Sequence, residues 1–216
     1  MSLPELKLDA QGLLCVVAQD HRTGEVRMVA YANREALERT LETGLATFWT
    51  RSREKLWTKG EQSGNTLRVV EVWIDCDADC ALYLVEPSGP TCHTGAPSCF
   101  FRRVDAQTKG RALPVLMRLE AELAERRAST ADESYTKRLL EAGAEKIGRK
   151  IREEAGELAD AIADEPDDRV VSEMADVLYH AMVGLLSRDI PLADVQAELA
   201  RRFGVSGLDE KASRER

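Results

Sequence analysis

The spacing of apolar residues changes once along the chain, and this change restricts the folds that are open to it. Before about residue 105, short runs rich in β-branched and aromatic residues lie between turns, which is typical of strands. After about residue 113, apolar residues recur every three or four positions, as on one face of a helix. The sequence therefore predicts a β-rich α+β domain over residues 1–110 and an all-α bundle over residues 111–216, joined by a linker at 108–110.

Composition divides the chain at the same place. All five cysteines and eight of the eleven aromatic residues lie in the first 110 residues, whereas the second part carries most of the net charge of −8. An acidic chain without a basic cluster argues against non-specific nucleic-acid binding. No apolar run approaches the length that spans a membrane. An odd number of cysteines, without a visible signal peptide, predicts a reducing compartment, which we take to be the cytoplasm.

The first domain is predicted to contain five strands and one helix. The helix covers residues 34–43, with Asn33 as its N-cap and Gly44 at its C-terminal end. Cys15 is expected to be a core residue of the first strand. The strands are predicted at residues 13–18, 26–31, 47–51, 67–74 and 100–104.

The second domain is predicted to contain four helices that pack as a bundle. Leu116, Leu119 and Leu123 have the spacing of a first helix of about 15 residues. The apolar face of a longer second helix is marked by Ile147, Ile151, Leu158 and Ile162. A polar break, the end of the second helix, the third helix and the fourth helix are expected at residues 128–134, 164–167, 170–186 and 192–202.

Residues 74–99 concentrate side chains that bind metals. Asp75, Asp77 and Asp79 alternate directly after a predicted strand. If that strand continues, the three carboxylates share one face and Cys76 points to the other. Grouped carboxylates repel one another unless a cation intervenes, and they suit a hard ion such as Mg²⁺. The alternative is a solvated acidic loop.

Three cysteines of the same stretch suit a softer metal. The thiolates of Cys76, Cys92 and Cys99 are suitable ligands for Zn²⁺. Three protein ligands leave a fourth position for water, as in catalytic zinc sites. Their C-x15-C-x6-C spacing is not that of a common zinc finger, and a cysteine is usually a small buried hydrophobe. Three aspartates beside three cysteines nevertheless favour a metal centre.

Residues 58–66 form a polar loop with two glycines. Backbone N–H groups and hydroxyls of such a loop can approach an anion closely. Lys59, Ser63 and Asn65 in the loop, and Arg51 before it, are therefore candidate contacts for a phosphate or a ribose. An ordinary hairpin loop is the alternative.

The predicted second and third helices of the second domain carry paired acidic residues. Glu154 and Glu157 lie three residues apart, as do Glu173 and Asp176, so each pair shares a helix face. If the helices pack antiparallel, the four carboxylates converge, which is unfavourable without divalent cations such as Mg²⁺. Glu153 would be a further ligand or a base. Two solvated helix faces are the alternative, since Glu-rich helices are common.

The first domain resembles the phosphoribosyl-AMP cyclohydrolase family. The motifs are D-C-D-x-D, G-P-x-C-H-T-G and S-C-F, preceded by M-V-A-Y-A-N, F-W-T-R-S-R, L-W-x-K-G-E and S-G-N-T-L, and the match covers most of residues 10–105. The resemblance implies a small barrel-like sheet, an obligate homodimer, and Mg²⁺ on Asp75, Asp77 and Asp79. It also implies Zn²⁺ on Cys76, Cys92 and Cys99, one of which comes from the partner subunit. Cys80 has no implied role.

The second domain is similar to the all-α nucleoside triphosphate pyrophosphohydrolases, and more closely to phosphoribosyl-ATP pyrophosphohydrolase. The motifs are E-E-x-x-E, E-x-A-D-x-x-Y-H and S-Y-T-x-x-L, within a match that covers roughly residues 113–203. Arg152 departs from the glycine expected before the paired glutamates, which bears on substrate fit rather than on the metal site. The resemblance implies Mg²⁺ on the acidic residues and makes Lys146, Arg149 and Lys150 candidate phosphate contacts.

Together the two resemblances imply the second and third steps of histidine biosynthesis. The second domain would hydrolyse phosphoribosyl-ATP to phosphoribosyl-AMP and pyrophosphate. The first would use zinc-activated water to open the adenine N1–C6 bond, giving the formimino-aminoimidazole carboxamide ribonucleotide, with His93 transferring a proton. The alternatives are a non-catalytic zinc module fused to a helical dimerisation bundle, and a general nucleotide pyrophosphohydrolase that has lost the cyclohydrolase activity.

Overall fold

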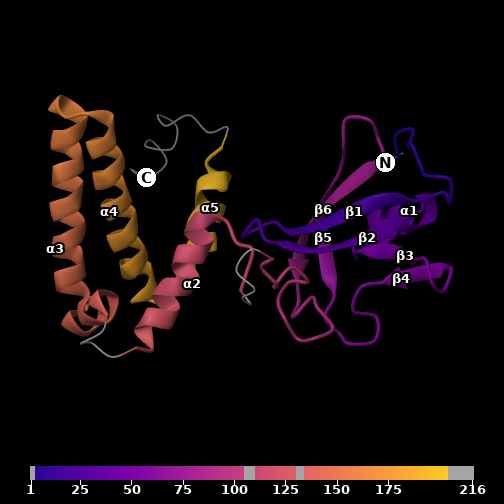
Figure 1. Ribbon diagram of the computed structural model, residues 1–216, viewed down its shortest axis with the longest axis horizontal. Helices are drawn as coiled ribbons and strands as arrows, with labels where there is room; N and C mark the ends of the chain where they lie inside the picture. Colours follow the sequence, from indigo (N-terminus) through magenta and orange to yellow (C-terminus); the bar gives the residue numbers. More distant parts are fainter. Residues whose placement is uncertain (1–2, 105–109, 130–133, 204–216) are drawn as a thin grey trace, which may run out of the picture. The chain divides into compact units, whose positions relative to one another are not determined.

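The computed structural model describes residues 3–104, 110–129 and 134–203. The chain forms two compact units, Met1–Pro114 and Val115–Arg216, each with its own apolar core (Figure 1). The first unit contains a sheet and one helix, and the second contains helices. This confirms the predicted layout of a β-rich part followed by an all-α part. The predicted linker at residues 108–110 lies mostly outside the described residues.

The first unit is built on one curled sheet with the strand order β4-β3-β2-β1-β6-β5 (Figure 1). Neighbouring strands pair antiparallel except β1 and β6, which run parallel. The strands are β1 (Leu14–Asp20), β2 (Val26–Ala32), β3 (Thr47–Thr50), β4 (Lys55–Thr58), β5 (Leu67–Ile74) and β6 (Cys80–Pro87). Because β6 lies between β1 and β5, the loops at its two ends start from a strand that is paired on both sides.

The helix of the first unit, α1 (Arg34–Thr43), has the predicted bounds. The side chain of Asn33 accepts a hydrogen bond from the N–H of Ala36, which satisfies one of the free donors of the first turn. Gly44 ends the helix at φ 69°, a left-handed conformation that a glycine adopts without steric cost. Both ends of α1 are therefore specified by residues next to it in the sequence.

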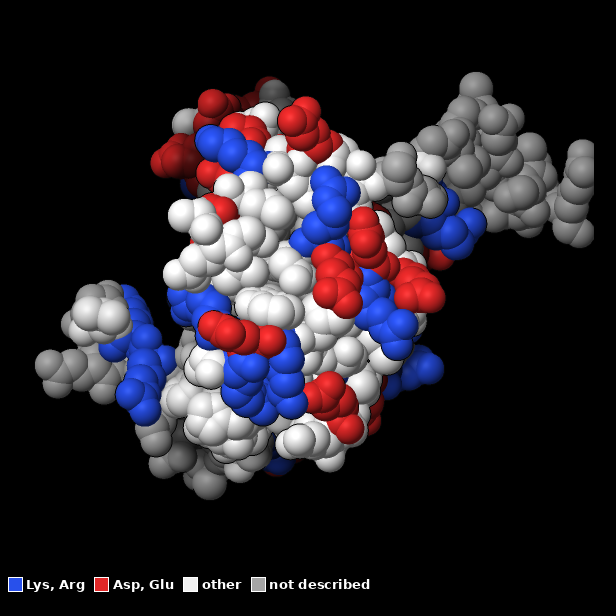
Figure 2. All heavy atoms as spheres, turned by 90° about the vertical axis from the view of Figure 1, so that its right-hand side faces the viewer, with Lys and Arg blue, Asp and Glu red and all other residues white. Residues whose placement is uncertain are grey.

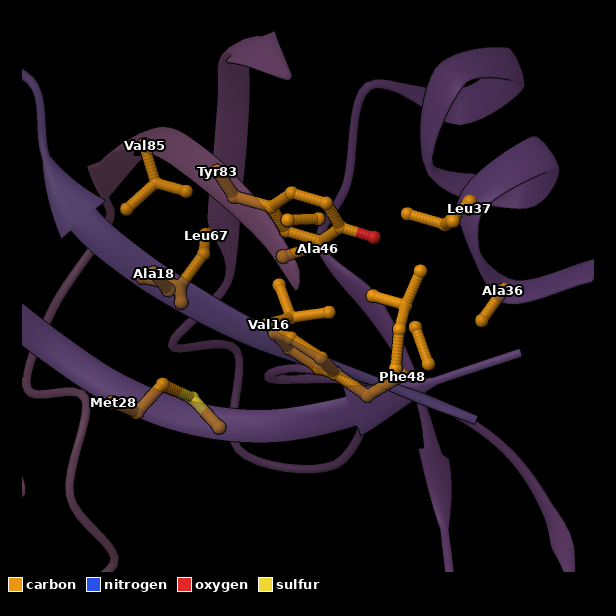
Figure 3. Packing of buried hydrophobic residues seen from close by; sticks show 13 residues of the cluster. Val16, Ala18, Met28, Ala36, Leu37, Ala46, Phe48, Leu67, Tyr83 and Val85 are labelled. Carbon is orange, nitrogen blue, oxygen red and sulfur yellow. The ribbon is translucent and has the colours of Figure 1, made fainter. Parts of the chain in front are cut away.

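The core of the first unit lies between α1 and the sheet. Phe48 of β3 and Tyr83 of β6 are fully buried, and their ring centroids are 5.8 Å apart. Leu37 of α1 and Val16 of β1 point into the same space (Figure 3). Alternate residues of β1 and β6 face this core, as a period of two requires. Cys15 lies between two of the core-facing residues of β1, so its side chain is on the other face of the sheet and is only partly buried. Its predicted position in the core is therefore wrong.

Two strands, β4 and β6, lie outside the predicted set. β4 has four residues, too few for a clear alternation, and it begins at the charged residue Lys55. β6 does alternate, and its buried residues are Ala81, Tyr83 and Val85. It lies inside the stretch where aspartates and cysteines dominate the sequence pattern.

The predicted strand at residues 100–104 is wrong, because only Arg102 forms an isolated bridge. The segment before it is bound to β2 instead. β3 pairs with β2 only through Tyr31 and Trp49, so the other end of that β2 edge is open. The N–H of Cys99 donates to the carbonyl of Arg27 there, at 2.8 Å. This contact brings the chain after β6 back to the sheet.

The second unit consists of α2 (Val115–Arg127), α3 (Tyr135–Asp164), α4 (Asp167–Leu186) and α5 (Leu192–Arg201). A short turn joins α3 to α4, and these two helices pack side by side (Figure 1). They therefore run antiparallel, which is the condition under which the acidic pairs of the two helices were expected to converge. Within α3, Gly143 has φ 82° and ψ 178°, so a kink separates its first two turns from the rest.

The four predicted helices are confirmed, with different bounds. α3 begins at Tyr135, directly after its N-cap Ser134, whose hydroxyl oxygen accepts a hydrogen bond from the N–H of Lys137, and α4 begins at Asp167. Ile147 is buried and Ile151 packs against the core, as predicted. Ile162 is 66% exposed and does not belong to the buried face, where Ala161 takes its place. After the kink, the buried residues of α3 are Ile147, Glu154 and Ala161, which lie seven residues apart, so Ile162 lies one residue away from the buried face.

Charges of both signs are interspersed on the face shown in Figure 2, which does not present a continuous basic surface among its described residues. Such a face offers no electrostatic track for a polyanion. None of the helices in the described ranges has the length and apolar character needed to span a bilayer.

Candidate active sites

The loop between β5 and β6 carries the three predicted aspartates. Carboxylate oxygens of Asp75, Asp77 and Asp79 all lie within 4.8 Å of one another, and the three residues are exposed. β5 ends at Ile74, as predicted, so the strand does not continue through the aspartates and strand alternation does not place them on one face. The aspartates are brought together by a tight turn rather than by strand alternation, and Cys76 lies exposed in the same turn.

Hydrogen bonds organise this acidic turn. The backbone N–H groups of Cys80 and Asp79 each donate to Oδ1 of Asp75 at 3.0 Å. These donors, first that of Cys80, lower the pKa of Asp75. Ala78 takes a left-handed conformation at φ 63°, and Lys7 lies 3.3 Å from Asp77. The turn therefore holds three carboxyl groups close together, which suits a divalent cation.

Two cysteines line a pocket of about 490 Å³ in the first unit. Cys92 lies in a loop after β6, and Cys99 lies where that loop returns to β2. The predicted residues that share this pocket are Lys59, Ser63, Asn65, Cys92, His93 and Cys99. The polar loop after β4 and the cysteine loop after β6 therefore face one another across one cavity.

The two thiols of the pocket have opposite pKa shifts. The hydroxyl of Thr94 donates to Sγ of Cys92 at 3.2 Å, and this bond lowers the pKa of Cys92. Burial, with the neighbouring Cys92 thiol, raises the pKa of Cys99 to about 11. Burial also lowers the pKa of Lys59, whose Nζ donates to the carbonyl of Asn65 at 2.9 Å. Cys92 is thus the thiol that ionises first.

Cys76 lies apart from this pair. It does not line the pocket, and the sulfurs of Cys76, Cys92 and Cys99 do not all lie within 4.8 Å of one another in one chain. The reason is the strand between them. β6 has eight residues, and at about 3.3 Å per residue its ends are roughly 25 Å apart. The acidic turn precedes β6 and the cysteine loop follows it.

Two further predicted residues of the first unit have different surroundings. His93 lines the pocket, with Nδ1 3.9 Å from Sγ of Cys92. Arg51 lies instead at a separate cavity of about 770 Å³, where its guanidinium stacks 3.9 Å from the centre of the Tyr31 ring. Trp57 lines both cavities, so they are neighbours on the sheet.

In the second unit, α3 and α4 bring acidic side chains together. Carboxylate oxygens of Glu154, Glu157 and Glu173 all lie within 4.8 Å of one another. Glu154 and Glu173 are buried, and Glu157 is exposed. Desolvation, and then the negative charges of Glu154 and Glu173, raise the pKa of Glu157. Asp176 is not part of this group, so three of the four predicted carboxylates converge.

Cations of the same helices balance the cluster. Nζ of Lys150 lies 2.8 Å from Oε1 of both Glu153 and Glu154, and its hydrogen bond lowers the pKa of Glu153. Arg169 lies 2.5 Å from Glu173. Lys150 thus contacts carboxylates rather than standing free. Lys146 and Arg149 are exposed on α3, and Arg149 pairs with Glu145.

A partly buried polar network beside this cluster had no predicted role. Nδ1 of His180 lies 2.9 Å from the carbonyl of Asp176 and 3.7 Å from Glu154, while its Nε2 lies 3.3 Å from the hydroxyl of Tyr135. The Tyr179 and Thr136 hydroxyls are bonded at 2.8 Å. These groups tie the first turn of α3 to α4. Their signal in the sequence was a polar Y-H pair on a largely apolar helix.

Family comparisons match both units. The model of phosphoribosyl-AMP cyclohydrolase matches residues 28–101, and that of phosphoribosyl-ATP pyrophosphohydrolase matches residues 116–203. The first match contains the acidic turn and the thiol pocket, and the second contains the acidic cluster of α3 and α4. The order of the two matches is the order of the two units.

Full-length relatives join the same two domains. The chain is 42% identical over 203 residues to the histidine biosynthesis bifunctional protein HisIE of Caldanaerobacter subterraneus, covering 94% of this chain and 98% of that protein. It is 44% identical to the protein of that name from Aquifex aeolicus, over 92% and 98% of the two chains. For Deinococcus radiodurans the identity is 46%, over 95% of each chain.

A chain with these two domains and these two groups of sites is a bifunctional hydrolase. It belongs to the family of histidine biosynthesis bifunctional proteins, in which a phosphoribosyl-AMP cyclohydrolase precedes a phosphoribosyl-ATP pyrophosphohydrolase.

Proposed function

We propose that residues 111–216 hydrolyse phosphoribosyl-ATP to phosphoribosyl-AMP and pyrophosphate, and that residues 1–110 then open the adenine N1–C6 bond. The product is the formimino-aminoimidazole carboxamide ribonucleotide. The observation that carries this proposal is the pairing of an acidic cluster and a thiol pocket with the two matched domains. The two reactions are consecutive, so the product of the second domain is the substrate of the first.

In the helical domain, Glu154, Glu157 and Glu173 would hold Mg²⁺, with Asp176 as a fourth acidic residue one turn further along α4. Bound Mg²⁺ would neutralise phosphate charge and activate the attacking water. Glu153 remains ionised because of Lys150, so it can accept a proton or act as a further ligand. Convergence of three carboxylates on antiparallel helices supports this assignment.

In the sheet domain, Cys92 and Cys99 would bind Zn²⁺ together with a Cys76 from a second subunit of a homodimer. This arrangement is supported by the shared pocket of the first two thiols and the exposed, separate position of Cys76. Zinc would supply activated water for attack at C6 of the purine. His93, beside Cys92, would transfer the proton. Reduced thiols are required, which fits a cytoplasmic enzyme.

The remaining predicted residues would bind the nucleotide. Lys59, Ser63 and Asn65 face the thiols across the pocket and suit the ribose or phosphate. Arg51, stacked on Tyr31, would contact a second phosphate from the neighbouring cavity, and the acidic turn of Asp75, Asp77 and Asp79 would bind a phosphate through Mg²⁺. In the helical domain, Lys146 and Lys150 would bind the nucleotide phosphates, and both lysines also interact with carboxylates.

Chromatography of the products formed from phosphoribosyl-ATP, with Mg²⁺ and Zn²⁺ present, tests the proposal. Ring-opened ribonucleotide together with pyrophosphate is the expected result. Accumulation of phosphoribosyl-AMP would contradict the assignment of the thiol pocket, because only the helical domain would be active. Unchanged substrate in a folded, metal-loaded sample would favour a non-catalytic zinc module.

A further inference from the structure

Four charged side chains form a cluster beside the loop that carries Cys92, and we call it the buried ion cluster. It consists of Asp20, Glu25, Arg27 and Arg111. NH2 of Arg27 lies 2.6 Å from Asp20, and its NH1 lies 3.1 Å from Glu25. Arg111 donates to both oxygens of Glu25, at 3.1 and 2.8 Å. The side chains of Asp20, Glu25 and Arg27 are 5%, 0% and 9% exposed, and that of Arg111, which balances the charge, is 41% exposed, so the cluster is desolvated except at Arg111.

Arg27 is the member that reaches the cysteine loop. Its NH1 donates to the carbonyl of Pro97 at 2.9 Å. The same carbonyl accepts the N–H of Thr91 at 3.2 Å, and the next rung joins the N–H of Cys92 to Ala96 at 3.0 Å. The guanidinium therefore caps the hydrogen bonds that close the loop around Cys92.

The backbone of Arg27 holds the other thiol. Its carbonyl accepts the N–H of Cys99 at 2.8 Å. The hydroxyl of Ser98 donates to the carbonyl of Val26 at 2.7 Å, which fixes the same point of the loop. One residue of β2 thus fastens the loop on both sides, with its side chain near Cys92 and its main chain at Cys99.

We propose that Arg27, held by Asp20 and Glu25, is a positioning residue that sets the placement of the Cys92 and Cys99 thiols for zinc. This inference rests on the proposed function, in which these thiols are zinc ligands. A planar guanidinium can serve Asp20, Glu25 and Pro97 at once from fixed directions. A lysine keeps the positive charge but lacks the planar geometry, so an Arg27→Lys variant separates the effect of the charge from the effect of the geometry.

The test compares Arg27→Lys with Arg39→Lys in the full chain. Arg39 is an exposed α1 residue that pairs with Glu42 at the surface, which makes it a matched control. We expect Arg27→Lys to bind zinc about tenfold to a hundredfold more weakly in competition with a chelator. In the metal-free protein, its Cys92 should react faster with a thiol reagent. The cyclohydrolase kcat should fall more than KM changes.

A second variant guards against loss of folding. Arg27→Met combined with Asp20→Asn removes one charge of each sign and leaves Glu25 paired with Arg111. It also removes the donor to Pro97, so the same zinc loss is expected. All three tryptophans of the chain lie in the first 110 residues, so tryptophan fluorescence reports whether this unit is folded.

The outcomes separate this inference from the proposed function. Wild-type zinc affinity and thiol reactivity in a folded Arg27 variant would overturn the positioning role. Zinc binding that is unchanged by Cys92→Ala would instead overturn the proposed zinc site itself. Pyrophosphate release by the helical domain should remain at the wild-type level in every one of these variants.

Discussion

A substitution in one domain should affect only the reaction of that domain, because each group of sites lies within one unit. We expect Cys92→Ala to abolish ring opening and to leave pyrophosphate release intact. Glu154→Gln should show the reverse, with pyrophosphate release reduced more than about a hundredfold. Assays of each step with its own substrate measure both effects.

Matched controls exist for both changes. Cys80→Ala alters a partly buried thiol next to the acidic turn, and Glu145→Gln alters an exposed carboxylate on α3 that pairs with Arg149. Neither control should change either rate. Loss of both activities in Cys92→Ala, or full pyrophosphate release in Glu154→Gln, would contradict the assignment of independent sites.

The buried pair of Asp20 and Arg27 predicts a pH-dependent contribution to stability. Burial alone would raise the pKa of Asp20, but the hydrogen bonds from Arg27, Thr23 and Arg22 outweigh it, and the pKa falls below the usual 3.8. A carboxyl with a lowered folded-state pKa stabilises the fold above its unfolded value, and that stability is lost as the pH falls through the folded value. Asp20→Asn should therefore cost roughly 3 kcal/mol at pH 7.

Urea unfolding of the metal-free protein, followed by tryptophan fluorescence, measures this effect. The difference between Asp20→Asn and wild type should shrink as the pH is lowered below 3.8. Glu42→Gln, which breaks an exposed ion pair, should change the free energy of unfolding by less than about 1 kcal/mol both at pH 7 and below pH 3.8. An Asp20→Asn difference that is the same at both pH values would contradict the sign of the pKa shift.

At the scale of elements, the kink in α3 should be sensitive to substitution. Gly143 has φ 82° and ψ 178°, a region that only glycine occupies without strain. Gly143→Ala should destabilise the helical unit by about 1–3 kcal/mol. It should also lower pyrophosphate release, since the turns before the kink carry Tyr135 and Thr136 to His180 and Tyr179.

Gly148 provides the comparison for that change. It lies in the same helix with helical geometry, and an added Cβ would meet only the end of the Arg152 side chain at 3.6 Å. Gly148→Ala should stabilise the helix by up to about 1 kcal/mol. Thermal unfolding followed by circular dichroism compares the two variants. Equal changes in thermal stability for Gly143→Ala and Gly148→Ala would contradict the strained backbone conformation assigned to Gly143.

Elements specified by neighbouring residues were predictable from the sequence, and others were not. α1 has its predicted bounds because Asn33 and Gly44 cap it locally. The acidic turn differs from its prediction because β5 ends at Ile74, a point set by the turn around Ala78 rather than by alternation. Convergence of three glutamates was predictable, since helical spacing fixes which side chains share a face.

The role of Arg27 illustrates what the sequence could not supply. A charged residue between Val26 and Met28 stands out in an apolar strand. Its partners Asp20 and Glu25 lie nearby in the β1–β2 hairpin, but its contact with Pro97 depends on how the chain folds back after β6. Long-range contacts of this kind have no local pattern.

At the scale of the whole molecule, the proposed sharing of a zinc site between subunits predicts complementation between two inactive variants. Cys76→Ala and Cys92→Ala should each lack ring opening. A mixed dimer of the two would contain one site with all three cysteines, from the intact Cys76 of one subunit and Cys92 of the other. Random mixing should restore about a quarter of wild-type activity.

Co-expression of the two variants, followed by the ring-opening assay, measures this recovery. A mixture of Cys92→Ala with Cys99→Ala should remain inactive, because these thiols share one pocket and neither subunit supplies both. Recovery in that control, or none in the Cys76 mixture, would contradict the shared site.

The acidic cluster also couples the helical unit to its ionic surroundings. Glu154 and Glu157 belong to α3 and Glu173 to α4, so one cation bound there joins two helices that the unfolded chain does not hold together. By mass action, each tenfold rise in free cation above its dissociation constant adds about 1.4 kcal/mol to the folded state. With Mg²⁺ as the proposed cation, the melting temperature of this unit would report the free magnesium concentration without any substrate.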